Sequence, residues 1–168
     1  MQKRRQIFSI LMTLLVAAVF CPVSEATISL SASPVRGGSS LRFGRVDTTR
    51  PTSQEVRVRV TSDEGNQYQI FQSMITPFTN EKGEFLHASA LETYAITGSN
   101  SVGRLYLQQI TTMKTVDDLL YSSSQSGESG SLTMVDSVNP SQVNASGRFS
   151  GKIMYTLRPV SGGSQKQV

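Results

Sequence analysis

The chain has 168 residues, a formal net charge of +4, one cysteine, no tryptophan and one histidine, His87. Zinc sites built from several Cys and His ligands are excluded by this inventory, and nothing in the spacing of His87 supports a nucleophile–histidine pair. We therefore expect no enzyme and no catalytic, cofactor or metal site; paired carboxylates, whose separation is decided by the fold, are the enzymatic arrangement left open.

Residues 1–26 have the pattern of a secretory signal peptide. Three positive charges in the first five residues precede an apolar stretch at 7–20, and Ser24 and Ala26 are small residues where a cleavage site needs them. The stretch, about 14 residues long, is shorter than the ~20 of a membrane-spanning helix, so we expect no span after the leader is removed. The alternatives are a retained anchor and a lipoprotein acylated at Cys21, against which Phe20 stands where lipoprotein signals need a small residue.

Removal of the leader changes the charge and the cysteine content of what remains. It takes away three positive charges and Glu25, so +4 becomes +2 on about 142 residues, and Cys21 leaves with it. A charge this small argues against nucleic acid as a partner. The mature chain must fold without disulfides, and its length suits one domain.

Residues 27–40 read as a strand followed by a flexible joint. Ile28, Leu30 and Ala32 alternate with hydroxyl residues, and Gly and Ser dominate residues 37–40. The apolar face of this strand must be covered either by its own domain, as the first strand of a self-complete sandwich, or by the groove of a neighbouring subunit.

Residues 41–159 read as a run of strands separated by turns. Val56, Val58 and Val60 alternate with arginine, and an alternating run spans 148–157 with Phe149, Gly151, Ile153, Tyr155 and Leu157 on one face. Shorter candidates lie at 67–74, 85–96 in one or two pieces, 104–113, 119–123 and 132–138, with Gly, Asn, Asp and Pro between them. A weak helical pattern covers 84–94. We expect an all-β, immunoglobulin-like antiparallel β-sandwich of roughly seven to nine strands, and a disordered polar tail at 160–168.

Arginines are concentrated in the first part of the mature chain. Arg57 and Arg59 share one face of the Val-rich strand because every second residue of a strand points the same way. One interpretation is a surface for an anionic partner, since guanidinium groups bind phosphate and carboxylate in a bidentate manner. The other is a strand kept soluble by outward charges.

Four features of the sequence resemble bacterial fimbrial and spore-coat-type subunits assembled by a chaperone and an usher. They are the exported leader, the alternating N-terminal strand, the segment 41–46 and the closing run at 147–157. The resemblance implies an incomplete domain that accepts a strand from the next subunit. It implies Ile28, Leu30 and Ala32 as donor residues, and the strand of Phe149, Ile153, Tyr155 and Leu157 as the border of the acceptor groove.

The sequence therefore predicts an exported structural or adhesive subunit, found in the periplasm or at the cell surface of a bacterium. Its expected partners are other copies of itself or related subunits, and an export chaperone. The alternative is a secreted or periplasmic binding module that recognises a glycan or a peptide through its loops.

Overall fold

The computed structural model describes residues 27–36, 43, 45–46, 49, 52–63, 65–98 and 102–160. These residues form eleven strands and two short 3-10 turns. The predicted leader, most of the Gly/Ser joint and the predicted tail from 161 onward lie outside the described residues. The elements in chain order are β1 (Ile28–Pro34), β2 (Arg45–Val46), β3 (Thr52–Ser62), β4 (Tyr68–Thr79), η1 (Ala88–Ala90), β5 (Leu91–Gly98), β6 (Arg104–Leu105), β7 (Thr111–Thr112), β8 (Asp118–Ser122), β9 (Gly130–Val138), η2 (Pro140–Gln142), β10 (Gly147–Arg148) and β11 (Ser150–Pro159).

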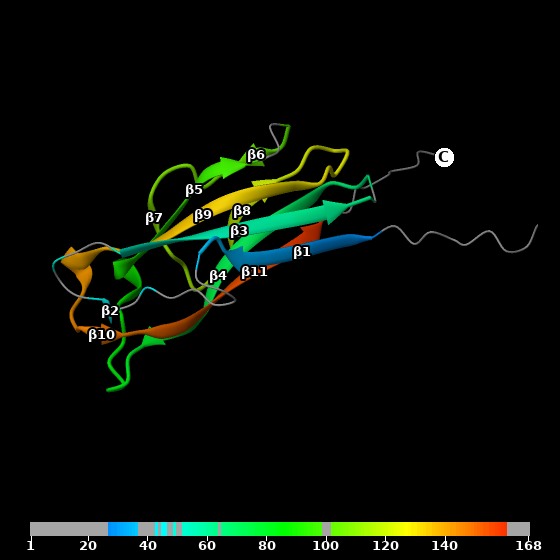
Figure 1. Ribbon diagram of the computed structural model, residues 1–168. Coiled ribbons are helices and arrows are strands. Elements are labelled where there is room, and N and C mark those ends of the chain that lie inside the picture. Colours follow the sequence, from blue (N-terminus) through cyan, green and yellow to red (C-terminus); the bar gives the residue numbers. More distant parts are fainter. Residues whose placement is uncertain are drawn as a thin grey trace, which may run out of the picture.

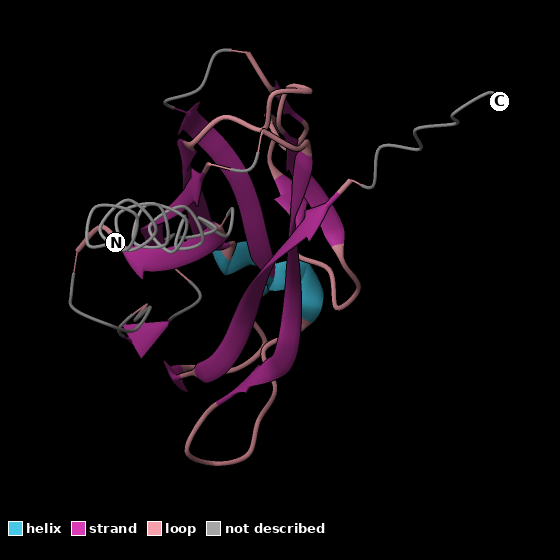
Figure 2. Ribbon diagram, turned by 90° about the vertical axis from the view of Figure 1, so that its right-hand side faces the viewer, coloured by secondary structure: helices cyan, strands magenta, loops and turns pink. Residues whose placement is uncertain are grey.

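Two antiparallel sheets pack face to face (Figures 1 and 2). The first has the strand order β1-β3-β9-β5-β7 and the second has the order β11-β4-β8-β6, while β10 and β2 form a separate two-stranded pair. The predicted all-β antiparallel sandwich is confirmed. Seven strands have five residues or more, and the count reaches eleven because β2, β6, β7 and β10 have two residues each.

The Val-rich alternation explains why β3 can lie in the middle of a sheet. Val56, Val58 and Val60 are almost fully buried, whereas Arg57 and Arg59 between them are exposed. β3 pairs with β1 on one side and β9 on the other. One face of the strand thus supplies the core and the other faces solvent.

The buried apolar residues fall into two clusters along the sandwich. One is built around Val58, Ile70, Leu120 and Met134, and the other around Phe78, Leu91 and Met113. Gly151 is required where the second cluster meets β11, because a Cβ there would lie 2.5 Å from the ring of Phe78.

Several sequence boundaries are corrected by the structure. The candidate strand at 85–96 begins only at Leu91, and the helical pattern at 84–94 yields only the single 3-10 turn η1. The candidate at 104–113 is two short strands, β6 and β7, because its chain leaves one sheet for the other. Among the described residues no helix is long and apolar enough to cross a membrane.

Candidate functional site

The two sides of the sandwich differ in how they are closed. On one side, the segment from β6 to β7 switches sheets: Tyr106 N donates to Leu120 O of β8 at 2.8 Å, and Ala95 N of β5 donates to Leu107 O at 2.7 Å. Leu105 and Leu107 pack against the core from this segment. The chain itself therefore covers this side, and the edge strands there are only two residues long.

On the other side lie two long edge strands, β1 with seven residues and β11 with ten. Figure 1 shows them side by side, β1 in blue and β11 in orange and red, with β5, β6 and β7 across the molecule. Each pairs with one neighbour only among the described strands, β1 with β3 and β11 with β4. Long edges of this kind are templates for pairing with another chain.

The hydrogen-bond pattern shows which backbone groups of β11 face outward. Val160 N donates to Gln67 O of the facing chain at 2.7 Å, so residue 160 belongs to the hydrogen-bonded set. Because bonded and non-bonded positions alternate in an antiparallel pair, Met154, Thr156 and Arg158 bond to β4, whereas Ile153, Tyr155 and Leu157 turn their N–H and C=O groups away from it.

The same reasoning applies to β1. Val35 N donates to Glu55 O at 2.8 Å and Asp63 N donates to Thr27 O at 3.2 Å, so the odd-numbered residues bond to β3. Ile28, Leu30 and Ala32 then direct their backbone groups to the free edge. Both edges present a row of groups able to accept a further strand.

Between these two edges lies a groove of about 380 Å³. Its mouth includes the exposed residues Ala32, Lys152 and Met154, and its inner end is formed by Asp136, which is 0% exposed. The lining is mostly apolar and comes from five strands: Ala32, Ser33 and Pro34 of β1, Val56 of β3, Ile75 and Phe78 of β4, Asp136 of β9, and Gly151, Lys152, Ile153, Met154 and Tyr155 of β11.

Asp136 belongs to a buried polar cluster that joins the two sheets. Strand register places Thr93 opposite Asp136 in one sheet and Gln72 opposite Tyr155 in the other. Thr93 Oγ1 lies 2.8 Å and Gln72 Nε2 lies 3.2 Å from Asp136 Oδ1, while the Tyr155 hydroxyl lies 3.4 Å from Asp136 Oδ2. Four strands thus contribute one residue each to a cluster at the inner end of the groove.

The protons of this cluster favour a neutral Asp136. The Thr93 hydroxyl has one hydrogen but two acceptors within reach, Asp136 Oδ1 and Gln72 Oε1, the latter at 3.2 Å. If Asp136 is protonated it can donate to Thr93, which then donates to Gln72, and each oxygen has a partner.

Burial raises the pKa of Asp136 to about 6, although the hydrogen bonds from Thr93, Gln72 and Tyr155 act in the opposite direction. Burial also raises the pKa of Tyr155, and the neighbouring Asp136 adds to that effect.

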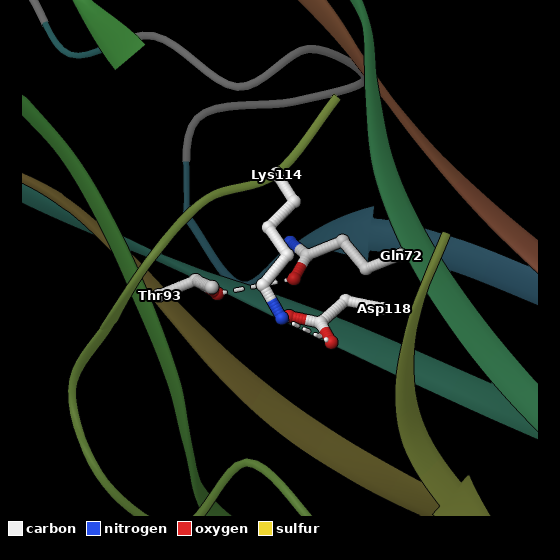
Figure 3. Close-up of polar contacts among 4 residues, drawn as sticks. All are labelled: Gln72, Thr93, Lys114 and Asp118. Atoms are coloured by element: carbon white, nitrogen blue, oxygen red, sulfur yellow. Dashed lines mark hydrogen bonds and ion pairs between the residues drawn. The ribbon is translucent and has the colours of Figure 1, made fainter. Parts of the chain in front are cut away.

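An ion pair lies beside the cluster. Figure 3 shows the contact of Thr93 with Gln72, together with Lys114 Nζ at 2.9 Å from Asp118 Oδ1. Asp118 is the register partner of Gln72 on β8, and its second oxygen, Oδ2, is buried without a hydrogen-bond partner among the described residues. The polar cluster is therefore flanked by a carboxylate that already has its own cation.

The predicted donor residues lie in their own sheet. Ile28 and Leu30 of β1 pack on the core of the same molecule, and Ala32 is exposed at the groove. Of the two possibilities that the sequence left open for this strand, the structure shows pairing within its own domain, in register with β3 from Ile28 to Pro34.

The predicted groove-bordering residues lie along β11 and just before it. Ile153 and Tyr155 line the groove itself, whereas Phe149 and Leu157 pack on the two core clusters. The structure thus brings Ala32, Ile153 and Tyr155 together at one groove.

Arg57 and Arg59 lie on the outer face of β3, away from the groove. Both are exposed, and their register partners on β1 are Ser33 and Ser31. They form a basic stripe on the flat face of the first sheet, separate from the site between the sheet edges.

Sequence reasoning missed Asp136, Gln72 and Thr93. A signal existed for Asp136, the single acidic residue within the otherwise apolar and hydroxyl run of β9. Gln72 and Thr93 carry no such signal, because only the strand register brings them to the same place.

Comparison with known proteins adds no relative: neither the protein-family models nor the curated proteins contain a match to this chain. In the part of the chain that the structure describes, no group of three or more His, Cys, Asp or Glu residues is placed to hold a metal ion.

Proposed function

We propose that this protein is an exported structural subunit of a bacterial surface or coat assembly, and that copies assemble by strand pairing. The segment 27–36 of one copy leaves its own sheet and adds to the free edge of β11 in the next copy. The observation that carries the proposal is the asymmetry of the sandwich: the chain closes the β6–β7 side, whereas the described residues leave a groove between β1 and β11.

The exposed apolar side chains around the groove support this role. Ile75 is 51% exposed, Met154 41% and Val35 37%, and all three lie at or next to the groove lining. Apolar side chains at a free sheet edge favour a further strand, because pairing removes them from water while satisfying the backbone.

Charge argues against symmetric pairing of two β11 strands. An antiparallel pair centred on Tyr155 would place Lys152 of each copy opposite Arg158 of the other, and like charges at opposed positions are destabilising. Residues 28–34 carry no charge, so β1 meets no such repulsion. Pairing of β1 with β11 is heterologous, and repeated from copy to copy it links subunits into rings or open chains.

Cysteine cross-linking tests the proposed contact, because the mature chain has no cysteine of its own. In one molecule Ser31 and Met154 point to the outer faces of different sheets, so a Ser31→Cys, Met154→Cys variant can link only between molecules. We expect a ladder of disulfide-linked oligomers on a non-reducing gel.

The matched control pairs Ser31→Cys with Thr112→Cys, an exposed position on the short edge strand β7. If the control forms the same ladder, or if the Met154 variant stays monomeric, β11 is not the accepting edge.

A further inference from the structure

We infer that removal of the leader after Ala26 places the new α-ammonium group of Thr27 against the carboxylate of Asp63, and that this terminal ion pair holds β1 on β3 in the free subunit. The inference rests on the export and the strand addition proposed above. It deepens them by naming the contact that keeps the donor strand in its own sheet until assembly.

Two independent observations meet at Thr27. The sequence predicts cleavage after Ala26, because Ser24 and Ala26 supply the small residues that a cleavage site needs. In the structure β1 begins directly after Thr27, at Ile28, and Thr27 N lies 2.5 Å from Asp63 Oδ1. The nitrogen atom that cleavage converts into an ammonium group therefore already lies next to a carboxylate.

The Asp63 side chain takes the place of a backbone acceptor at this end of β1. The register continues from the pair of Ile28 and Ser62 to Thr27 and Asp63, where two residues of an antiparallel pair ordinarily exchange both N–H···O bonds. Asp63 N donates to Thr27 O at 3.2 Å, whereas Thr27 N donates to the Asp63 carboxylate. A positive charge on this donor adds Coulomb attraction to the hydrogen bond.

The carboxylate of Asp63 has no other cation beside it in the described structure. Asp63 is exposed, and neither of the two ion pairs among the described residues involves it. Before cleavage, Thr27 N is an uncharged amide nitrogen that can donate a hydrogen bond but carries no charge. The terminal ion pair therefore forms only in the processed chain.

A contact at its end matters to β1 because little else holds this strand. None of its seven residues is buried, and among the described strands it pairs with β3 alone. Local opening of such a strand requires much less free energy than global unfolding. An exposed charge pair contributes little to a whole domain, but it changes a local opening equilibrium about two- to fivefold.

The experiment measures amide hydrogen exchange of Ser29 and Ser31, whose N–H groups bond to β3, in two forms of the monomeric mature protein. One form begins at Thr27. The other keeps Ala26, so that Thr27 N is an amide and the ammonium group lies one residue away. We expect slower exchange in the form that begins at Thr27. Asp63→Asn should speed exchange about two- to fivefold more in that form than in the other, and the excess should shrink in about 1 M NaCl.

Glu81→Gln is the matched control, because it removes one negative charge from an exposed turn after β4 and should affect the two forms equally. An equal effect of Asp63→Asn in the two forms overturns the terminal ion pair, because the carboxylate then acts on the amide alone. If Asp63→Asn does not fold, the two unsubstituted forms still decide: equal or faster exchange in the form that begins at Thr27 overturns the inference.

The Ser31→Cys, Met154→Cys pair distinguishes this outcome from a failure of the proposed function. In the form that keeps Ala26, the disulfide ladder should appear about two- to fivefold faster, because β1 leaves its sheet more often. Absence of a ladder from both forms overturns strand addition, whereas the exchange result decides the terminal ion pair separately. Equal rates of ladder formation in the two forms overturn its role in retaining the donor strand.

Discussion

At the scale of single residues, Asp136 is the most informative position in the molecule. A carboxyl group at 0% exposure between two sheets is unusual, because burial of an ionised group is unfavourable unless it is paired. Its partners are hydroxyl and amide groups with no charge. Burial in the folded subunit therefore shifts Asp136 toward its protonated form and raises its pKa to about 6.

This preference predicts a pH dependence of stability. The pKa is about 6 in the folded protein and 3.8 as the ordinary value, so between these two the folded state binds more protons than the unfolded state. The contribution of Asp136 to the free energy of unfolding is therefore fully present below pH ~4, falls as pH rises toward ~6 and levels off above that. At about 1.4 kcal/mol per pKa unit, the fall amounts to about 3 kcal/mol.

Asp136→Asn should remove this fall, since the amide keeps the shape and cannot ionise. Urea unfolding at pH 4, 5, 6 and 8 measures the free energy of unfolding of the variant and of the wild type, and the two values are compared at each pH. A difference that stays constant across the four values contradicts the burial of a titrating carboxyl.

Arg57 and Arg59 illustrate the opposite case of charges that belong to the surface. Because both are exposed on the outer face of β3, the double substitution to Ser should change the free energy of unfolding by no more than about 0.5 kcal/mol. Chemical denaturation measures this. A several-fold loss of affinity for an anionic partner in a variant that still folds would instead show that the basic stripe binds.

At the scale of elements, the sequence predicts strands well where one face is buried and the other is not. The alternation of β3 and of β11 is visible in the sequence because each strand has one apolar face and one polar face. The sequence predicts β4 only as far as Met74, because Pro77 lies in the stretch beyond it, where the strand continues through a bulge to Thr79. The polar cluster depends on which strands become neighbours, and register of that kind leaves no periodic trace in one strand.

A substitution in β8 tests how tightly the two sheets pack. Leu120 is fully buried between them, so Leu120→Ala should lower the free energy of unfolding by about 2 to 5 kcal/mol. Ile110→Ala is the control, because Ile110 is 62% exposed and should change stability by no more than about 0.5 kcal/mol. Comparable losses in thermal or urea unfolding for the two variants would contradict the packing described here.

At the scale of the whole molecule, the sandwich is closed on one side by its own chain, and the described residues leave the other side open. The sheet-switching segment between β6 and β7 shows how this fold covers a gap between sheets when the chain supplies a segment for it. Between β1 and β11 the described chain supplies none, and the groove remains with two unpaired strand edges beside it. We propose that assembly completes the sandwich there.

Amide hydrogen exchange of β11, compared between the monomer and the assembled protein, tests this proposal most directly. The N–H groups of Ile153, Tyr155 and Leu157 point to the free edge, while those of Met154, Thr156 and Arg158 already bond to β4 and serve as the internal control. We predict that the first three exchange rapidly in the monomer and slowly in the assembly, with the control amides slow in both. Rapid exchange at Ile153, Tyr155 and Leu157 in a protein that has assembled would contradict strand addition at this edge.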